Sequence, residues 1–178
     1  MKKIMVMFAV MFTALSAFAD SHDSAFNLIA RNEGYRATVY RCTAGKESIG
    51  YGFTSKQYVQ KKFMSKAEAD GILHAYVDAC LRSVEGLNIK VQLTDNQKAV
   101  LADMVYHFGS GAIHDANDLL NAINSGNPDR VKAQLMRWVK QKKVVNGKIV
   151  RDSNGKIVYE TVSGLVNRQA RLCQLWDK

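Results

Sequence analysis

Two helix-start signals do most to limit the fold of this chain. Ser65 is followed three residues later by Glu68, and Thr94 is followed by Gln97, which is the capping-box pattern at the first turn of a helix. Apolar residues then recur at helical spacing: Ala69, Leu73, Tyr76, Cys80 and Val84 after the first signal, and Val100, Leu101, Met104, Val105 and Phe108 after the second. We therefore predict two long core helices, the first over about residues 65–84, and a mainly helical fold.

A shorter helix is predicted over residues 22–33. Its apolar side carries Phe26 and Ile29, Glu33 falls on the same side, and Gly34 ends the helix. A carboxyl group at that position is partly buried and close to the negative end of the helix dipole, and both effects raise its pKa. We expect the raised pKa that a general acid needs. The alternative is a solvated glutamate at a helix end.

The segment from about 35 to 62 differs from the helices around it. Ile49 and Tyr51 alternate with glycines, and tight-turn glycines recur at positions 45, 50 and 52. This pattern predicts a small antiparallel sheet. Such sheets commonly support catalytic groups carried on loops.

The C-terminal half contains shorter helices. The sequence predicts them at about 115–124, at 128–140 and at 163–176, and Pro128 suits a first helical turn. These helices and the second core helix form a helical body over about 94–178.

An internal repeat separates the last two helices. Asn146–Val150 and Asn154–Val158 both read Asn-Gly-Lys-Ile-Val. Because Asn-Gly pairs favour hairpin turns, we predict a two- or three-stranded β-ribbon over 142–160. We expect a structural flap. The alternative is binding to a cell wall through the basic residues Lys142, Lys143, Lys148, Arg151 and Lys156.

The first nineteen residues have the pattern of a secretory signal peptide. A basic start, Lys2 and Lys3, precedes an apolar stretch, and small residues follow up to Ala19. The stretch is too short for a comfortable permanent span. We predict cleavage after Ala19, an exported protein that is periplasmic or secreted, no stable membrane insertion afterwards, and one domain over 20–178. The alternative is a signal-anchor that leaves the membrane later.

Charge and cysteine content limit the partners. The net charge of +9 suits an anionic polymer. It would equally suit nucleic acid, but no zinc-finger spacing, phosphate-binding loop or basic-aromatic patch is present, so we expect no nucleic-acid partner. The histidines and cysteines lack metal-ligand spacing, and we predict no metal and no cofactor. Of the three cysteines we expect Cys42 to be free, whereas Cys80 and Cys173 are either bridged or simply buried.

Glu33, Cys42 and Ser48 follow one another with eight and five residues between them, and Ser48 opens the run Ser-Ile-Gly-Tyr-Gly. This block resembles the phage-type lysozymes, glycoside hydrolase family 24, which carry Glu, then Asp or sometimes Cys, then Thr at these places. The resemblance continues through four later segments: 65–69, 78–79, 93–97 with 108–109, and 164–168. It implies a two-lobed α+β fold with a small sheet lobe, a connecting helix at 65–84, and a helical lobe with the ribbon as an elaboration.

The resemblance also implies the chemistry. It predicts a monomeric muramidase that cuts the bond between N-acetylmuramic acid and N-acetylglucosamine in peptidoglycan, with Glu33 as general acid. A thiol has a pKa of about 8.5. Cys42 is therefore activated, is a nucleophile once ionised, or only lines the water site. Ser48 positions a water or bonds its own backbone in a turn. The competing function is a catalytically weak or inactive peptidoglycan-binding protein.

Further residues match the family's cleft. Tyr51 and His107 are predicted substrate contacts, and Arg168 matches an arginine that reaches the acid and would oppose the effect of burial. The family often has a histidine where this chain has Phe53, and a polar partner of that histidine aligns with Tyr76. We therefore hypothesise that an aromatic contact replaces a polar one here.

Overall fold

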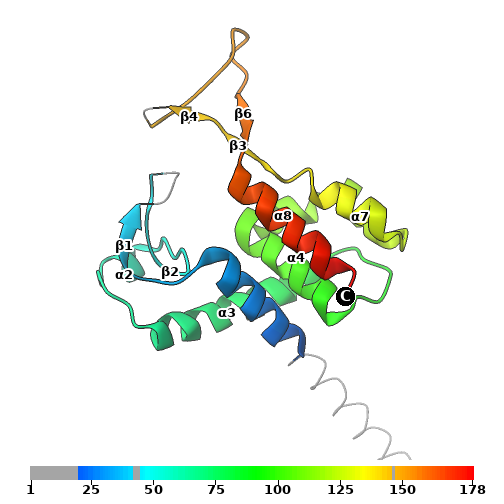
Figure 1. Cartoon of the computed structure of the whole chain (residues 1–178), viewed down its shortest axis with the longest axis horizontal. Helices are drawn as coiled ribbons and strands as arrows, with labels where there is room; N and C mark the ends of the chain where they lie inside the picture. The colour runs from blue at the N-terminus through cyan, green and yellow to red at the C-terminus, as the bar shows by residue number, and fades with distance from the viewer. Residues whose placement is uncertain (1–19, 42–44, 146) are drawn as a thin grey trace, which may run out of the picture.

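The structure is a computed structural model that describes residues 20–41, 45–145 and 147–178. The predicted signal peptide and Cys42 lie outside these residues. Residues 20–33 are helical and lead into strand β1 (Arg36–Arg41), which pairs antiparallel with β2 (Glu47–Gly50), and the short helix α2 (Lys56–Val59) follows (Figure 1). The small antiparallel sheet that the glycine pattern predicts is therefore confirmed.

The two long core helices are also confirmed. They are α3 (Lys66–Glu85) and α4 (Asp95–Phe108), which pack against each other. The Ser65 hydroxyl accepts the Glu68 amide at the start of α3, and Thr94 and Gln97 form a complete capping box before α4. These bonds satisfy amides that have no partner inside the helix.

Four further helices complete the body: α5 (Ser110–His114), α6 (Asn117–Asn124), α7 (Pro128–Leu135) and α8 (Ser163–Trp176). The predicted extent of the helix at 128–140 is wrong, because α7 ends at Leu135. The amides of the next three residues bond to carbonyls three or four residues back, and the chain then enters a strand at Lys140. Pairing in the ribbon therefore replaces the last turns of the predicted helix.

The β-ribbon is confirmed in the segment that carries the Asn-Gly repeat. β3 (Lys140–Lys142) pairs with β6 (Tyr159–Thr161), and β4 (Val144–Val145) pairs with β5 (Lys148–Ile149). A further bridge joins Arg151 to Ile157. Gly147 and Gly155 both have φ of 76°, the left-handed conformation that these turns require. Figure 1 shows the ribbon projecting away from the helices.

One hydrophobic core joins the N-terminal helix to the body. Ile29 packs in the same buried cluster as Leu73 of α3, Leu101 and Met104 of α4, and Leu172 of α8. The fold is thus mainly helical α+β, with a small sheet beside a helical body. Within the residues that the structure describes, no helix has the length and apolar character needed to cross a membrane.

Candidate active site

Glu33 is the last residue of the N-terminal helix and faces the turn that follows β2. Gly34 has φ of 69°, which lets the chain leave the helix sharply. The Glu33 side chain is 18% exposed. A Cβ atom built on Gly52, which has φ of 86°, would lie 3.5 Å from Glu33 Oε2. The carboxyl group therefore lies against the glycine turn, as the motif predicts.

Arg168 of α8 holds the other side of this carboxyl group. Its Nη1 donates to Glu33 Oε1 at 2.8 Å, while Nε and Nη2 donate to the two oxygens of Asp103 at 2.8 and 2.9 Å. Asp103 is fully buried, and the Arg168 side chain is 6% exposed. The bidentate pair with Asp103 fixes the guanidinium plane, so that one donor points at Glu33.

His107, in the last turn of α4, completes the group. Its Nδ1 lies 2.8 Å from Arg168 Nη1 and 3.6 Å from Glu33 Oε1. The same ring nitrogen of His107 therefore lies within reach of both the guanidinium and the Glu33 carboxyl group. The structure thus brings together three of the residues predicted from sequence: Glu33, His107 and Arg168.

The pKa of Glu33 differs from the sequence prediction. Burial raises the pKa of the carboxyl group, but the neighbouring His107 ring and the positive charge and hydrogen bond of Arg168 outweigh burial, so that the pKa is lowered overall. The prediction of a raised pKa is therefore wrong for the unliganded protein. The physical reason is that the lowering effects of His107 and Arg168 together exceed the effect of burial.

Sequence reasoning missed the residues that hold Arg168 in place. Asp103 is one, and Asn32 is another: Asn32 Nδ2 donates to Asp103 Oδ1 at 2.9 Å, and its own Oδ1 accepts from Arg171 Nε at 3.0 Å. The sequence does contain a signal for Asp103. It stands among fully buried apolar positions of α4, and a buried carboxylate requires a cation or several donors.

The glycine turn is held from below by two tyrosines. Tyr51 is 3% exposed, its hydroxyl donates to Asp70 Oδ1 at 2.7 Å, and its carbonyl accepts the Tyr106 hydroxyl at 2.9 Å. Tyr51 was predicted as a substrate contact, whereas its burial here makes it a support for the turn. Ser48 is also buried, on β2 opposite Tyr40, so it is a strand residue and not a turn residue.

The predicted aromatic contact between Phe53 and Tyr76 is present. The rings of Phe53 and Tyr76 stack with centroids 5.6 Å apart and an interplanar angle of 14°. A Cβ atom on Gly50 would lie 2.8 Å from two carbons of the Phe53 ring. Gly50 is therefore needed both for its positive φ of 64° and for the space that Phe53 occupies.

The profile of the phage lysozyme family matches residues 30–171 of this chain, which include the whole of this arrangement. The chain belongs to the phage lysozyme family. An endolysin of Acyrthosiphon pisum secondary endosymbiont phage 1 is 33% identical over 121 residues, which cover 68% of this chain and 80% of that protein. Within this family the chain is a peptidoglycan-cleaving glycoside hydrolase.

Two further relatives agree with this assignment. A SAR-endolysin of Bacteriophage PS119 is 29% identical over 106 residues, which cover 60% of this chain and 62% of that protein. The structure of an endolysin from Escherichia coli O157:H7 phage FAHEc1 superposes with a TM-score of 0.69 at 25% identity, covering 86% of this chain and 90% of that one. The lysozyme-like fold is therefore shown by both sequence and structure.

Arg36 and Arg41 lie close to Cys42 in the sequence, and a positive charge near a thiol lowers its pKa. Both arginines already have other contacts. The Arg36 guanidinium lies 4.6 Å from the centroid of the Tyr40 ring, and Arg41 lies 4.0 Å from Glu47.

Cys80 and Cys173 are free thiols rather than a disulfide. Burial, with a smaller contribution from the Asp103 charge, raises the pKa of Cys80 to about 11, which keeps that thiol unreactive at neutral pH.

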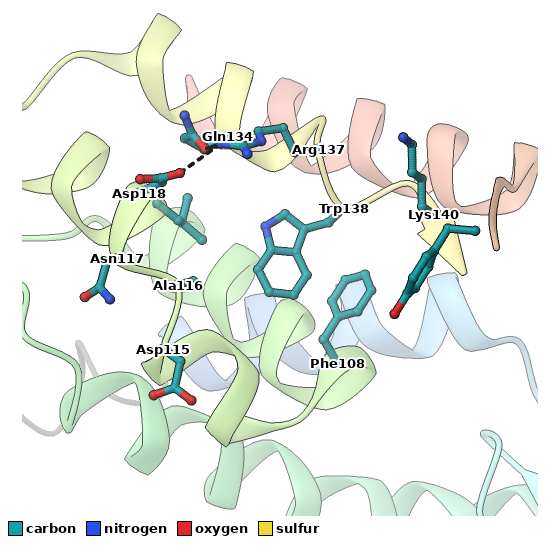
Figure 2. Close-up of a pocket in the computed structure, with 11 residues that line it drawn as sticks. Phe108, Asp115, Ala116, Asn117, Asp118, Gln134, Arg137, Trp138 and Lys140 are labelled. Atoms are coloured by element: carbon teal, nitrogen blue, oxygen red, sulfur yellow. Dashed lines mark hydrogen bonds and ion pairs between the residues drawn. The ribbon is translucent and has the colours of Figure 1, made fainter. Parts of the chain in front are cut away.

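A pocket of about 610 Å³ is connected to the acid group through one of its lining residues, Phe108. Phe108 links the two, because its ring centroid lies 4.7 Å from that of His107 and 4.9 Å from that of Trp138. Figure 2 shows the Phe108 and Trp138 rings side by side, with Lys140 beyond them. The wall opposite carries charge of both signs, including the Arg137–Asp118 pair at 2.9 Å.

Proposed function

We propose that the chain is a muramidase that hydrolyses the β-1,4 bond between N-acetylmuramic acid and N-acetylglucosamine, with Glu33 as the general acid. The observation that carries the proposal is the setting of that carboxyl group. Arg168 donates to Oε1, whereas Oε2 lies beside Gly52, a residue that carries no side chain. One oxygen is thus fixed, and the other remains available to give a proton to the leaving sugar oxygen.

Because the pKa of Glu33 is lowered, the carboxyl group must gain a proton when the substrate binds. In the unliganded protein the carboxyl group is ionised at neutral pH, whereas a general acid must be protonated. A sugar chain lying over Glu33 removes its remaining contact with water, and desolvation favours the neutral form of a carboxyl group. The proposed role of Arg168 and His107 is therefore to set the pH at which this proton is gained.

Cys42 and Ser48 are proposed to assist the attacking group. Cys42 falls in the segment that joins β1 to β2, and Ser48 is the second residue of β2. The thiol would serve as a nucleophile once ionised, or would line the water site, and the hydroxyl would position a water.

The proposed substrate partner is bacterial peptidoglycan. The pocket at Phe108 and Trp138 supports this, because its apolar rings and charges of both signs suit a wall fragment that extends from the cleaved bond. We infer export, to the periplasm or beyond, from the basic and apolar N-terminal sequence and from similarity to proteins named SAR-endolysin. We further propose that the protein is a monomer and that it uses no nucleic acid, metal or cofactor.

A zymogram with purified peptidoglycan tests the acid. Glu33→Gln keeps an oxygen that accepts from Arg168 but cannot give a proton, so we expect wall clearing to fall at least about 100-fold. Glu85→Gln, an exposed change at the end of α3, is the matched control and should clear normally. If Glu33→Gln clears the wall as well as the parent, the protein is better described by the competing function of a binding protein.

Cys42→Ala separates the possible roles of the thiol. We expect a sharp loss of turnover with an unchanged melting temperature, because the residue serves the attacking group and not the core. Cys173→Ala, which removes a free thiol elsewhere, should leave clearing intact. Full activity of Cys42→Ala would reduce its role to lining the site.

A further inference from the structure

The outer hairpin of the ribbon, which we define as β4 (Val144–Val145) and β5 (Lys148–Ile149), exposes aliphatic side chains to solvent. Val144, Val145 and Ile149 are 45%, 50% and 46% exposed. With Tyr159 of β6 they make four of the eight large apolar side chains that are exposed in the described part of the chain. Exposed apolar side chains gathered on one projecting element indicate an interaction surface.

The same ribbon is strongly basic. Residues 140–161 contain six lysines or arginines and two acidic residues. One of the acids, Asp152, accepts the backbone amides of Asn154 and Lys156 at 2.8 and 2.9 Å, so it serves its own turn. Among residues 20–41, 45–145 and 147–178, no ion pair joins any of the six cations to a carboxylate.

The combination of these two properties selects the partner. Lysines alone would be explained as protection of an exposed sheet edge, and cations alone would suit any anionic polymer. Neither explanation accounts for the three exposed aliphatic side chains of this hairpin. An anionic lipid surface satisfies both, because it attracts the cations and gives the aliphatic groups an apolar environment.

We propose that the outer hairpin docks the protein peripherally on an anionic lipid surface. Val144 pairs with Ile149, so these two side chains share one face of the hairpin, and Val145 shares the other face with Lys148. Along the chain, Lys142 and Lys143 come just before this hairpin or at its start, and Arg151 follows it. The tip enters the interface while the cations meet the lipid headgroups. None of the three aliphatic residues contacts the acid group, so docking is separate from hydrolysis.

Flotation of the full chain with lipid vesicles tests the proposal. The vesicles contain phosphatidylglycerol with phosphatidylethanolamine, and phosphatidylcholine vesicles give the neutral reference. We expect the triple variant V144S/V145S/I149S to lower binding to the anionic vesicles about tenfold. The control V91S/M136S removes exposed apolar side chains from outside the ribbon and should bind like the parent. Clearing of purified wall should be the same for all three proteins.

A local reporter separates the hairpin from any contribution of the apolar N-terminal sequence. Ile149→Trp should show a blue-shifted emission and quenching by brominated lipid in anionic vesicles, and Met136→Trp should show neither. Unchanged emission of Ile149→Trp, or vesicle binding that the triple variant retains in full, would overturn the proposal. Loss of binding to purified wall, with vesicle binding unaffected, would assign the hairpin to the wall polymer instead.

Discussion

Arg168 bonds two carboxyl groups with one guanidinium. Its bidentate bond neutralises Asp103 in the core, and its remaining donor lowers the pKa of Glu33. A general acid with a lowered pKa loses its proton at a lower pH. The alkaline limb of the pH–rate profile therefore lies further toward acid than burial alone would place it.

His107→Ala tests this balance without opening the core. The ring lowers the pKa of Glu33, so its removal raises that pKa, and Glu33 stays protonated to a higher pH. We expect the alkaline limb of wall clearing to move to higher pH, measured as initial rates across a pH series. His114→Ala, an exposed histidine of α5, should leave the limb in place. A shift toward acid would contradict the assignment of Glu33 as the acid.

At the scale of elements, local signals predicted most of the architecture. Capping boxes located α3 and α4, and Asn-Gly pairs located the ribbon, because these patterns act within a few residues. The end of α7 was missed because ribbon pairing between Lys140 and Thr161 decides it. The lowered pKa of Glu33 was missed for the same reason, since the groups that lower it, His107 and Arg168, come from distant helices α4 and α8. The family resemblance, not local pattern, indicated Arg168.

The glycine turn offers a test at this scale. Gly52 has a left-handed φ of 86°, so an alanine at this position would strain the turn. The new methyl group would also lie 3.5 Å from Glu33 Oε2 and crowd the acid. We expect a loss of about 1–2 kcal/mol in unfolding free energy and a further loss of kcat. Gly126→Ala has a similar φ of 65° with no atom near its Cβ. It should show the strain alone, and an equal loss of kcat in both variants would exclude crowding.

The whole molecule is cationic, and its substrate is a large anionic wall. Long-range attraction raises the rate of encounter with such a polymer and is screened by salt, with a Debye length of about 10 Å at 0.1 M. The net charge of the molecule affects the rate of association with the wall and not the rate of bond cleavage. The net charge of +9 belongs to the complete sequence.

Salt should therefore act differently on large and small substrates. We expect clearing of intact wall to slow several-fold between about 0.05 and 0.3 M salt, because the attraction is screened. Hydrolysis of a short, uncharged glycan fragment should change little over the same range. Equal slowing of both reactions would show that salt acts on the site and not on the encounter.

The contacts of Arg168 also join a residue near the start of the described chain to one near its end. Glu33 leaves the ribosome early, but the guanidinium that fixes it belongs to the last helix, α8. A nascent chain that lacks this helix has the acid without its anchor. The contacts that hold Glu33 in the folded protein are therefore complete only after α8 has been synthesised.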